Sequence, residues 1–151
     1  MALYEMIDDM PMFKNFTEKE KKIFAKMDHS LLEFKDGDTI IKEGDNFTSI
    51  YLLLKGSVLI TKTQDNRLIR LSKLNPGEIF GEMSYFSKNP RQSNIVARED
   101  NVLVLRIDED FFQKGKPIIK DKVKNYFIEL LCNRLDVMNE SIMKVSKLMR
   151  S

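Results

Sequence analysis

The sequence is poor in the residues that build disulfides, metal sites and many catalytic centres. Its 151 residues include one cysteine, Cys132, and one histidine, His29. A single cysteine excludes an internal disulfide and a cysteine-ligated metal cluster. A single histidine argues against a histidine metal site and against a histidine-based catalytic triad. These absences favour a protein that binds a ligand over an enzyme, and they predict no metal.

Strong charge imbalance and long apolar runs are missing as well. The net charge of +2 gives no strong case for nucleic-acid binding. Glu5, Asp8 and Asp9 stand near the start, where a targeting peptide would be basic, and no apolar stretch approaches membrane-spanning length. We therefore expect a soluble, cytoplasmic protein without a membrane partner, and the length fits one domain.

Only six glycines are present, and five of them fall at turns between short runs rich in aliphatic and β-branched residues. Short runs separated by turn residues are typical of strands in a sandwich or jelly-roll barrel. We predict about eight strands, with residues 58–61 paired to residues 50–53 across the turn at Lys55-Gly56. The runs that we identify as strands are residues 31–34, 39–41, 49–54, 58–61, 68–71, 95–98 and 102–107.

Helical patterns flank these strands. Thr17-Glu18-Lys19-Glu20 is a capping-box pattern, which predicts a helix start at Thr17. Acidic residues at 108–110 are typical of a helix N-terminus, and Gly115-Lys116-Pro117 should end that short helix. A long helix is expected from Ile118 onward. The predicted plan is an N-terminal helical segment (1–30), a β-barrel (31–107), and a hinge with a long C-terminal helix (108–151).

The long helix carries apolar residues at alternating spacings of four and three, which is a coiled-coil pattern. We predict a homodimer through this helix. Packing of the helix against its own barrel is the alternative explanation for part of the pattern. The residues concerned are Leu131, Leu135, Met138, Ile142, Val145 and Met149.

A glycine-rich stretch between the predicted strands has the chemistry of an anion site. Gly77 and Gly81 permit close approach of backbone N–H groups to an oxyanion. Arg91, which follows in a short Pro90-Arg91 turn, offers a planar fork of donors that matches a phosphate. Glu82 cannot bind that phosphate but can accept hydrogen bonds from hydroxyls beside it. An acid and an arginine around one short turn between strands therefore favour a sugar phosphate.

This stretch resembles the phosphate-binding cassette of cyclic-nucleotide-binding domains, the family of the catabolite activator protein and of cyclic-AMP-dependent kinase regulatory subunits. The resemblance implies that Glu82 holds the ribose 2′-hydroxyl and that Arg91 holds the cyclic phosphate. A second match, Gly37 and Gly44-Asp45 followed by Tyr51, Gly56 and Val58, is similar to the opening strands of the same family. The cassette spans residues 80–93, and its implied ligand-binding residues are Phe80, Gly81, Glu82, Met83, Ser84, Arg91, Gln92 and Ser93.

Residues 133–140 are similar to the long dimer helix of the catabolite-activator members. That resemblance implies that Met138 and Asn139 face the base of the nucleotide. The alternative is that Met138 only contributes to the coiled-coil contact and that Asn139 only faces solvent. The implied fold is α+β: an eight-stranded antiparallel jelly-roll β-barrel with an N-terminal helix and a long C-terminal helix.

The resemblance implies a non-enzymatic sensor that binds cyclic AMP and moves its C-terminal helix to signal to an effector protein. Gln92 stands where a hydroxyl favours the guanine nucleotide in some members, so we expect cyclic AMP ahead of cyclic GMP. The chain ends at Ser151 with no room for a helix-turn-helix domain, so no direct DNA binding is expected. The alternatives are a dimeric scaffold that binds no nucleotide and a fragment of a transcription regulator.

Overall fold

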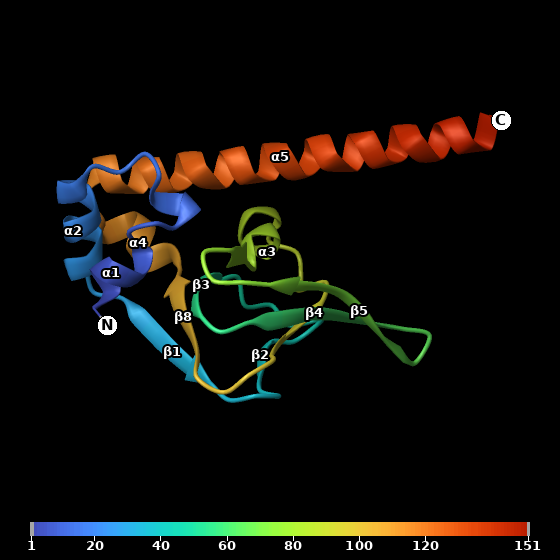
Figure 1. Cartoon of the computed structure of the whole chain (residues 1–151), viewed down its shortest axis with the longest axis horizontal. Coiled ribbons are helices and arrows are strands. Elements are labelled where there is room, and N and C mark those ends of the chain that lie inside the picture. Colours follow the sequence, from blue (N-terminus) through green and yellow to red (C-terminus); the bar gives the residue numbers. More distant parts are fainter. Residues whose placement is uncertain (1, 151) are drawn as a thin grey trace.

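The computed structural model describes residues 2–150 and contains eight strands and six helical segments (Figure 1). The strands are β1 (Ser30–Phe34), β2 (Thr39–Ile41), β3 (Ile50–Lys55), β4 (Val58–Gln64), β5 (Arg67–Leu74), β6 (Ile79–Phe80), β7 (Asn94–Ala97) and β8 (Val102–Ile107). The helices are α1 (Leu3–Ile7), the short 3₁₀ helix η1 (Pro11–Phe13), α2 (Glu18–Lys26), α3 (Glu82–Ser87), α4 (Glu109–Lys114) and α5 (Pro117–Arg150).

The strands form two separate antiparallel sheets, so the prediction of a closed barrel is wrong. One sheet has the order β1-β8-β3-β6 and the other has the order β2-β7-β4-β5. The predicted pairing of residues 58–61 with residues 50–53 is wrong too, because β3 and β4 lie in different sheets. Both edges of β3 are already occupied, by β8 and by β6. The turn at Gly56 therefore carries the chain from one sheet to the other.

The alternation of side chains along β3 explains how the layers are held together. Ile50 and Leu52 belong to a core cluster shared with the helices. Tyr51 and Leu53 belong to a second cluster that lies between the two sheets. Since successive strand residues point to opposite faces, the sheet containing β3 is the middle layer of the molecule. This buried layer gives the cassette a rigid support.

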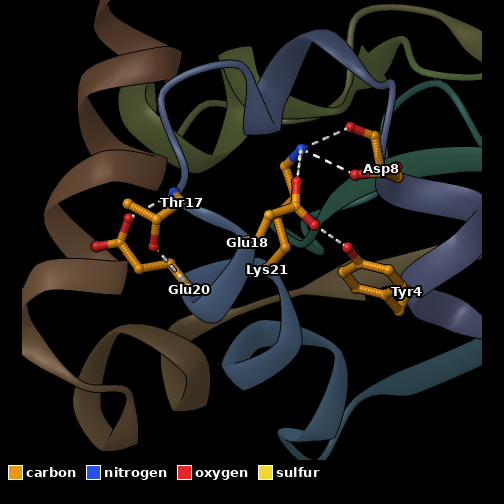
Figure 2. A network of polar contacts seen from close by, with 6 residues as sticks. All are labelled: Tyr4, Asp8, Thr17, Glu18, Glu20 and Lys21. Atoms are coloured by element: carbon orange, nitrogen blue, oxygen red, sulfur yellow. Dashed lines mark hydrogen bonds and ion pairs between the residues drawn. The ribbon is translucent and has the colours of Figure 1, made fainter.

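Hydrogen bonds and ion pairs join the N-terminal helices α1 and α2 (Figure 2). The predicted capping box is confirmed: the Glu20 N–H donates to Thr17 Oγ1 at 3.1 Å, and the Thr17 N–H donates to Glu20 Oε1 at 2.8 Å. Lys21 Nζ donates to the Asp8 backbone carbonyl at 3.0 Å and to Asp8 Oδ1 at 2.9 Å. These bonds fix α1 on α2.

The long helix α5 has a buried half and an exposed half. Ile119, Val123 and Phe127 are buried in the cluster that the helices share with β3. Beyond them the helix runs past the sheets, and its C-terminal end projects free of the other elements (Figure 1). The long uninterrupted helix is confirmed, starting one residue earlier than predicted, at Pro117.

Candidate functional site

The cassette begins with a turn that only glycine accommodates. Gly81 has a left-handed backbone, with φ of +85°, and it precedes α3 directly. A Cβ at Gly81 would lie 2.8 Å from the Ser49 backbone oxygen and 3.0 Å from Arg91 Nη1. The sequence prediction of a simple turn between strands missed α3, whose six residues place Glu82 in the first turn. The missing side chain at Gly81 is what lets Arg91 pack against the backbone there.

Arg91 is held rigidly although it is almost fully buried. Its Nη1 donates to the Gly81 carbonyl and its Nη2 donates to the Ser49 carbonyl, each at 2.7 Å. Its backbone N–H also donates to the carbonyl of Asp45. Burial lowers the pKa of Arg91, while electrostatic interactions with Tyr51 and Asp45 oppose that shift. A guanidinium starts from so high a pKa that it keeps its charge, so the site contains a fixed, buried cation.

Glu82 is equally buried, and it forms an ion pair with Arg134 of α5. Arg134 Nη2 also lies 3.5 Å from the carbonyl oxygen of Ile79. Burial lowers the pKa of Arg134, and the charge of Glu78 opposes that shift. Because a buried carboxylate is costly without a partner, Arg134 is an integral part of this site.

These groups surround a cavity of about 430 Å³ between α3, the sheet β2-β7-β4-β5 and α5. A volume of this size falls within the range of small-molecule sites. Eight of the ten predicted site residues line it, namely Phe80, Gly81, Glu82, Met83, Ser84, Arg91, Gln92 and Ser93. The Phe80 ring is stacked on the Tyr51 ring, with the two centroids 5.2 Å apart.

The other two predicted residues lie elsewhere. Met138 and Asn139 are exposed on the projecting half of α5 and do not line the cavity. Their contact with a base stays a prediction, and it requires the part of α5 beyond Arg134 to approach the cavity. Sequence reasoning missed Arg134, even though it lies within the stretch that suggested Met138 and Asn139. It also missed Ser72 and Leu74 of β5, which form part of the wall.

The cassette helix is tied to the helices that follow the sheets. Tyr85 donates its hydroxyl hydrogen bond to Glu109 Oε2 of α4 at 2.9 Å. Its ring lies 5.5 Å from the ring of Phe112, and Phe86 lies 6.1 Å from Phe127 of α5. Burial raises the pKa of Tyr85, and the hydrogen bond to Glu109 raises it further. A shift of α3 would therefore be felt directly by α4 and α5.

Residues 2–150 contain neither a metal-ion cluster nor a membrane-spanning helix. Within this range no group of three or more histidine, cysteine, aspartate or glutamate residues is placed to hold a metal ion. None of the helices described is both long and apolar enough to cross a membrane.

Comparisons with known sequences agree with this geometry. A family profile described as "Cyclic nucleotide-binding domain" matches residues 31–115. Human cGMP-dependent protein kinase 2 is 35% identical over 100 residues, which cover 63% of this chain and 13% of the kinase. The cAMP-dependent protein kinase type II regulatory subunit of Drosophila melanogaster is 27% identical over 131 residues, which cover 84% of this chain and 34% of the subunit. The chain thus spans about a third of the length of one of these relatives and about an eighth of the other.

Solved structures agree on the fold. The catabolite activator protein of Thermus thermophilus superposes with a TM-score of 0.78 at 26% identity, over 90% of this chain and 63% of that one. A cyclic nucleotide-binding domain from Methylobacillus flagellatus has the same fold, with a TM-score of 0.74 at 22% identity, over 94% of this chain and 81% of that one. From its matched sequence, its two-sheet fold and its cassette, we conclude that this chain belongs to the cyclic nucleotide-binding domain family.

Proposed function

We propose that this domain is a sensor that binds cyclic AMP in the 430 Å³ cavity and passes the signal to an effector protein through α5. The observation that carries the proposal is the buried guanidinium of Arg91. Two backbone carbonyls orient it beside the cavity, and a fixed guanidinium matches a phosphate. A buried cation is costly unless a counter-charge reaches it, and a cyclic phosphate would supply one.

Glu82 gives the site a hydrogen-bond acceptor, which suits a ligand with hydroxyl groups better than an anion without them. Its carboxylate lines the cavity together with Arg91, and an ionised carboxylate accepts hydrogen bonds. The ribose 2′-hydroxyl of a cyclic nucleotide is a suitable donor. The relatives include a kinase named for cyclic GMP and a kinase subunit named for cyclic AMP. We favour cyclic AMP because Gln92 lines the cavity in place of a small hydroxyl residue.

The expected affinity follows from ligand size. Cyclic AMP has about 22 non-hydrogen atoms, and ~0.3 kcal/mol per atom gives a dissociation constant on the order of 10 μM. In this role the protein would be a cytoplasmic, non-enzymatic regulator. It would form a homodimer through the projecting half of α5. In this state it would act on an effector protein.

Calorimetric titration with cyclic AMP, cyclic GMP and linear 5′-AMP tests the proposal. We expect cyclic AMP to bind most tightly and 5′-AMP to bind weakly, because the linear phosphate does not fit the same fixed donors. Arg91→Ala should weaken cyclic AMP binding by ~30-fold or more, since a buried charge loses its partner. Arg98 is an exposed arginine outside the cavity, so Arg98→Ala is the matched control and should bind as the native protein does.

Absence of heat with both cyclic nucleotides, together with an unchanged melting temperature in their presence, would contradict the sensor function. A nucleotide-independent scaffold would then be the better explanation. Circular dichroism of Arg91→Ala guards against misfolding, and Glu82→Gln provides a second variant of the site. It should bind more weakly than the native protein but more tightly than Arg91→Ala, because Glu82 serves neutral hydroxyls.

A further inference from the structure

One edge of the sheet β2-β7-β4-β5 is open. Strand β5 is the last strand of this sheet and pairs only with β4. Within residues 2–150 no other strand pairs with its outer side. The β4–β5 hairpin extends beyond the other strands, away from the N-terminal helices (Figure 1). About half of the backbone N–H and C=O groups of such a strand point outward without a strand partner.

Strand β5 also exposes large aliphatic side chains. Leu68 is 67% exposed, Ile69 is 37% exposed and Leu71 is 55% exposed. Single exposed aliphatic residues are common on protein surfaces, but three within four residues on an open edge are not. A strand with these features is suited to pairing with an added strand.

The charge of the hairpin indicates which kind of strand would pair with it. Arg67, Arg70 and Lys73 lie on β5, and Lys62 of β4 is directly opposite Ile69. Pairing of β5 with β5 of a second copy would bring these cations close together, and like charges on facing strands are destabilising. An acidic strand would meet opposite charges at the same positions. The charge pattern therefore disfavours a second copy and favours an acidic occupant.

The chain already satisfies the other side of this hairpin with an acid. Strand β7 pairs with β4 as far as Thr61. Past that point, the Thr63 N–H donates to Glu43 Oε1 at 3.1 Å. A carboxylate thus accepts a hydrogen bond from one free backbone N–H of β4, so the hairpin already has a negative charge beside a strand edge.

We propose that the open edge of β5 (Arg67–Leu74) binds an extended acidic segment of a partner protein by strand addition. Carboxylates of the segment pair with Arg70 and Lys73, which lie on one face of β5, and its aliphatic residues pack on Ile69 on the other face. The same strand contributes Ser72 and Leu74 to the cavity wall, so the partner contacts an element that also faces the cavity. The interaction itself does not depend on nucleotide binding.

The test is an NMR titration of the ¹⁵N-labelled protein with a peptide of alternating glutamate and valine, eight residues long to match β5. We expect amide shifts concentrated at residues 67–74, with binding that weakens as salt is added. Arg70→Glu should weaken binding by about tenfold or more. Arg98→Glu reverses an exposed charge on a different segment and should bind the peptide as the native protein does.

Three results would overturn the proposal. The first is no change at β5 with millimolar peptide. The second is equal binding of a peptide with lysine in place of glutamate, which would leave no role for the charges. The third is a change of the β5 signals on simple dilution of the protein, which would mean that a second copy covers this edge. Each of these measurements uses only the wild-type protein, so the proposal can be tested even if Arg70→Glu fails to fold.

Discussion

Arg134 of α5 pairs with Glu82 of α3, and this ion pair joins the C-terminal helix to the cassette. Glu82 is 3% exposed, whereas the Arg134 side chain is 42% exposed. The pair therefore has a buried acidic end and a partly solvated basic end. The cost of losing Arg134 is consequently paid mainly by Glu82, which would remain buried and unpaired.

We predict that Arg134→Ala lowers the free energy of unfolding by roughly 1–3 kcal/mol, the range for a buried group left without its hydrogen-bond partner. Partial exposure of Arg134 keeps the value below that of a fully buried pair. Urea denaturation measures it, with Arg150→Ala as an exposed arginine control on the same helix. In the Glu82→Gln background, Arg134→Ala should cost clearly less. Equal costs in both backgrounds would show that the pair contributes nothing.

Gly81 and Gly37 form a matched test of the cassette turn. Both have left-handed backbones, with φ of +85° and +88°. A Cβ at Gly37 would meet nothing within 4 Å, whereas a Cβ at Gly81 would meet the Ser49 oxygen at 2.8 Å. Gly37→Ala should cost about 1–2 kcal/mol from backbone strain alone. Gly81→Ala should cost roughly 1–3 kcal/mol more, from overpacking.

Chemical denaturation of the two variants checks this difference. Gly81→Ala should also weaken nucleotide binding, because the added methyl group displaces Arg91, while Gly37→Ala should leave binding intact. Equal loss of stability in the two variants would mean that the cassette relaxes around the methyl group at no cost.

His29 should make stability depend on pH just below neutrality. Its Nε2–H donates to the Phe24 carbonyl at 2.6 Å, and its ring lies 4.5 Å from the Phe24 ring. Burial lowers the pKa of His29, although the Phe24 carbonyl and Asp28 oppose the shift. The unfolded chain, with a histidine pKa of about 6.5, then binds a proton more readily than the folded protein. Stability should therefore fall as the pH drops below about 6.5.

Urea denaturation at a series of pH values between about 7.5 and 5.5 measures this fall, because histidine is the side chain that normally titrates there and the chain has only one. His29→Gln keeps a donor for the Phe24 carbonyl but does not titrate, so its stability should vary less over the same range. The same pH dependence in both proteins would exclude His29 as the cause.

The projecting half of α5 should join two copies of the chain. Leu135 is 58% exposed and Ile142 is 62% exposed. Ile128, also exposed, extends the predicted apolar spacing by one position toward the N-terminus. Three heptads of this kind, counted from Ile128 to Met149, approach the length that supports a coiled coil. We expect a dimer in sedimentation velocity.

Ile142→Asp should shift that dimer to monomer, because it places a charge in the apolar contact. Met143 is equally exposed but lies outside the repeat, so Met143→Asp should remain dimeric. A native monomer at high concentration, or the same response from both variants, would contradict dimerisation through this helix.

Local signals predicted the flanking helices and selected residues that line one cavity. The Thr17–Glu20 capping box and the turn at Gly115 depend on neighbouring residues alone, and both are confirmed. The hairpin turn between β4 and β5 is equally local, because it is made by Asp65 and Asn66 with left-handed φ values of 53° and 62°. The cassette residues are also close in sequence, so one short motif was enough to identify eight residues that line the cavity.

The failures concern relations between distant residues. Whether Val58 pairs with β3 or with β7 depends on which strand edges are already occupied, and a turn sequence does not contain that information. Arg134 was missed because its partner, Glu82, lies on another helix, and a sequence motif describes only one continuous segment. The short strand β6 was missed because two residues give no detectable alternation.

The length of α5 has a mechanical consequence. Its last buried residue is Phe127, so the stretch to Arg150 is about 35 Å long at ~1.5 Å per residue. A helix without proline or glycine beyond Pro117 behaves as a stiff rod. A tilt of about 10° at its anchored base would sweep its tip through roughly 6 Å. Small displacements of α3, transmitted by Tyr85 and Phe86, would thus be amplified into a movement large enough to remodel a surface far from the cavity.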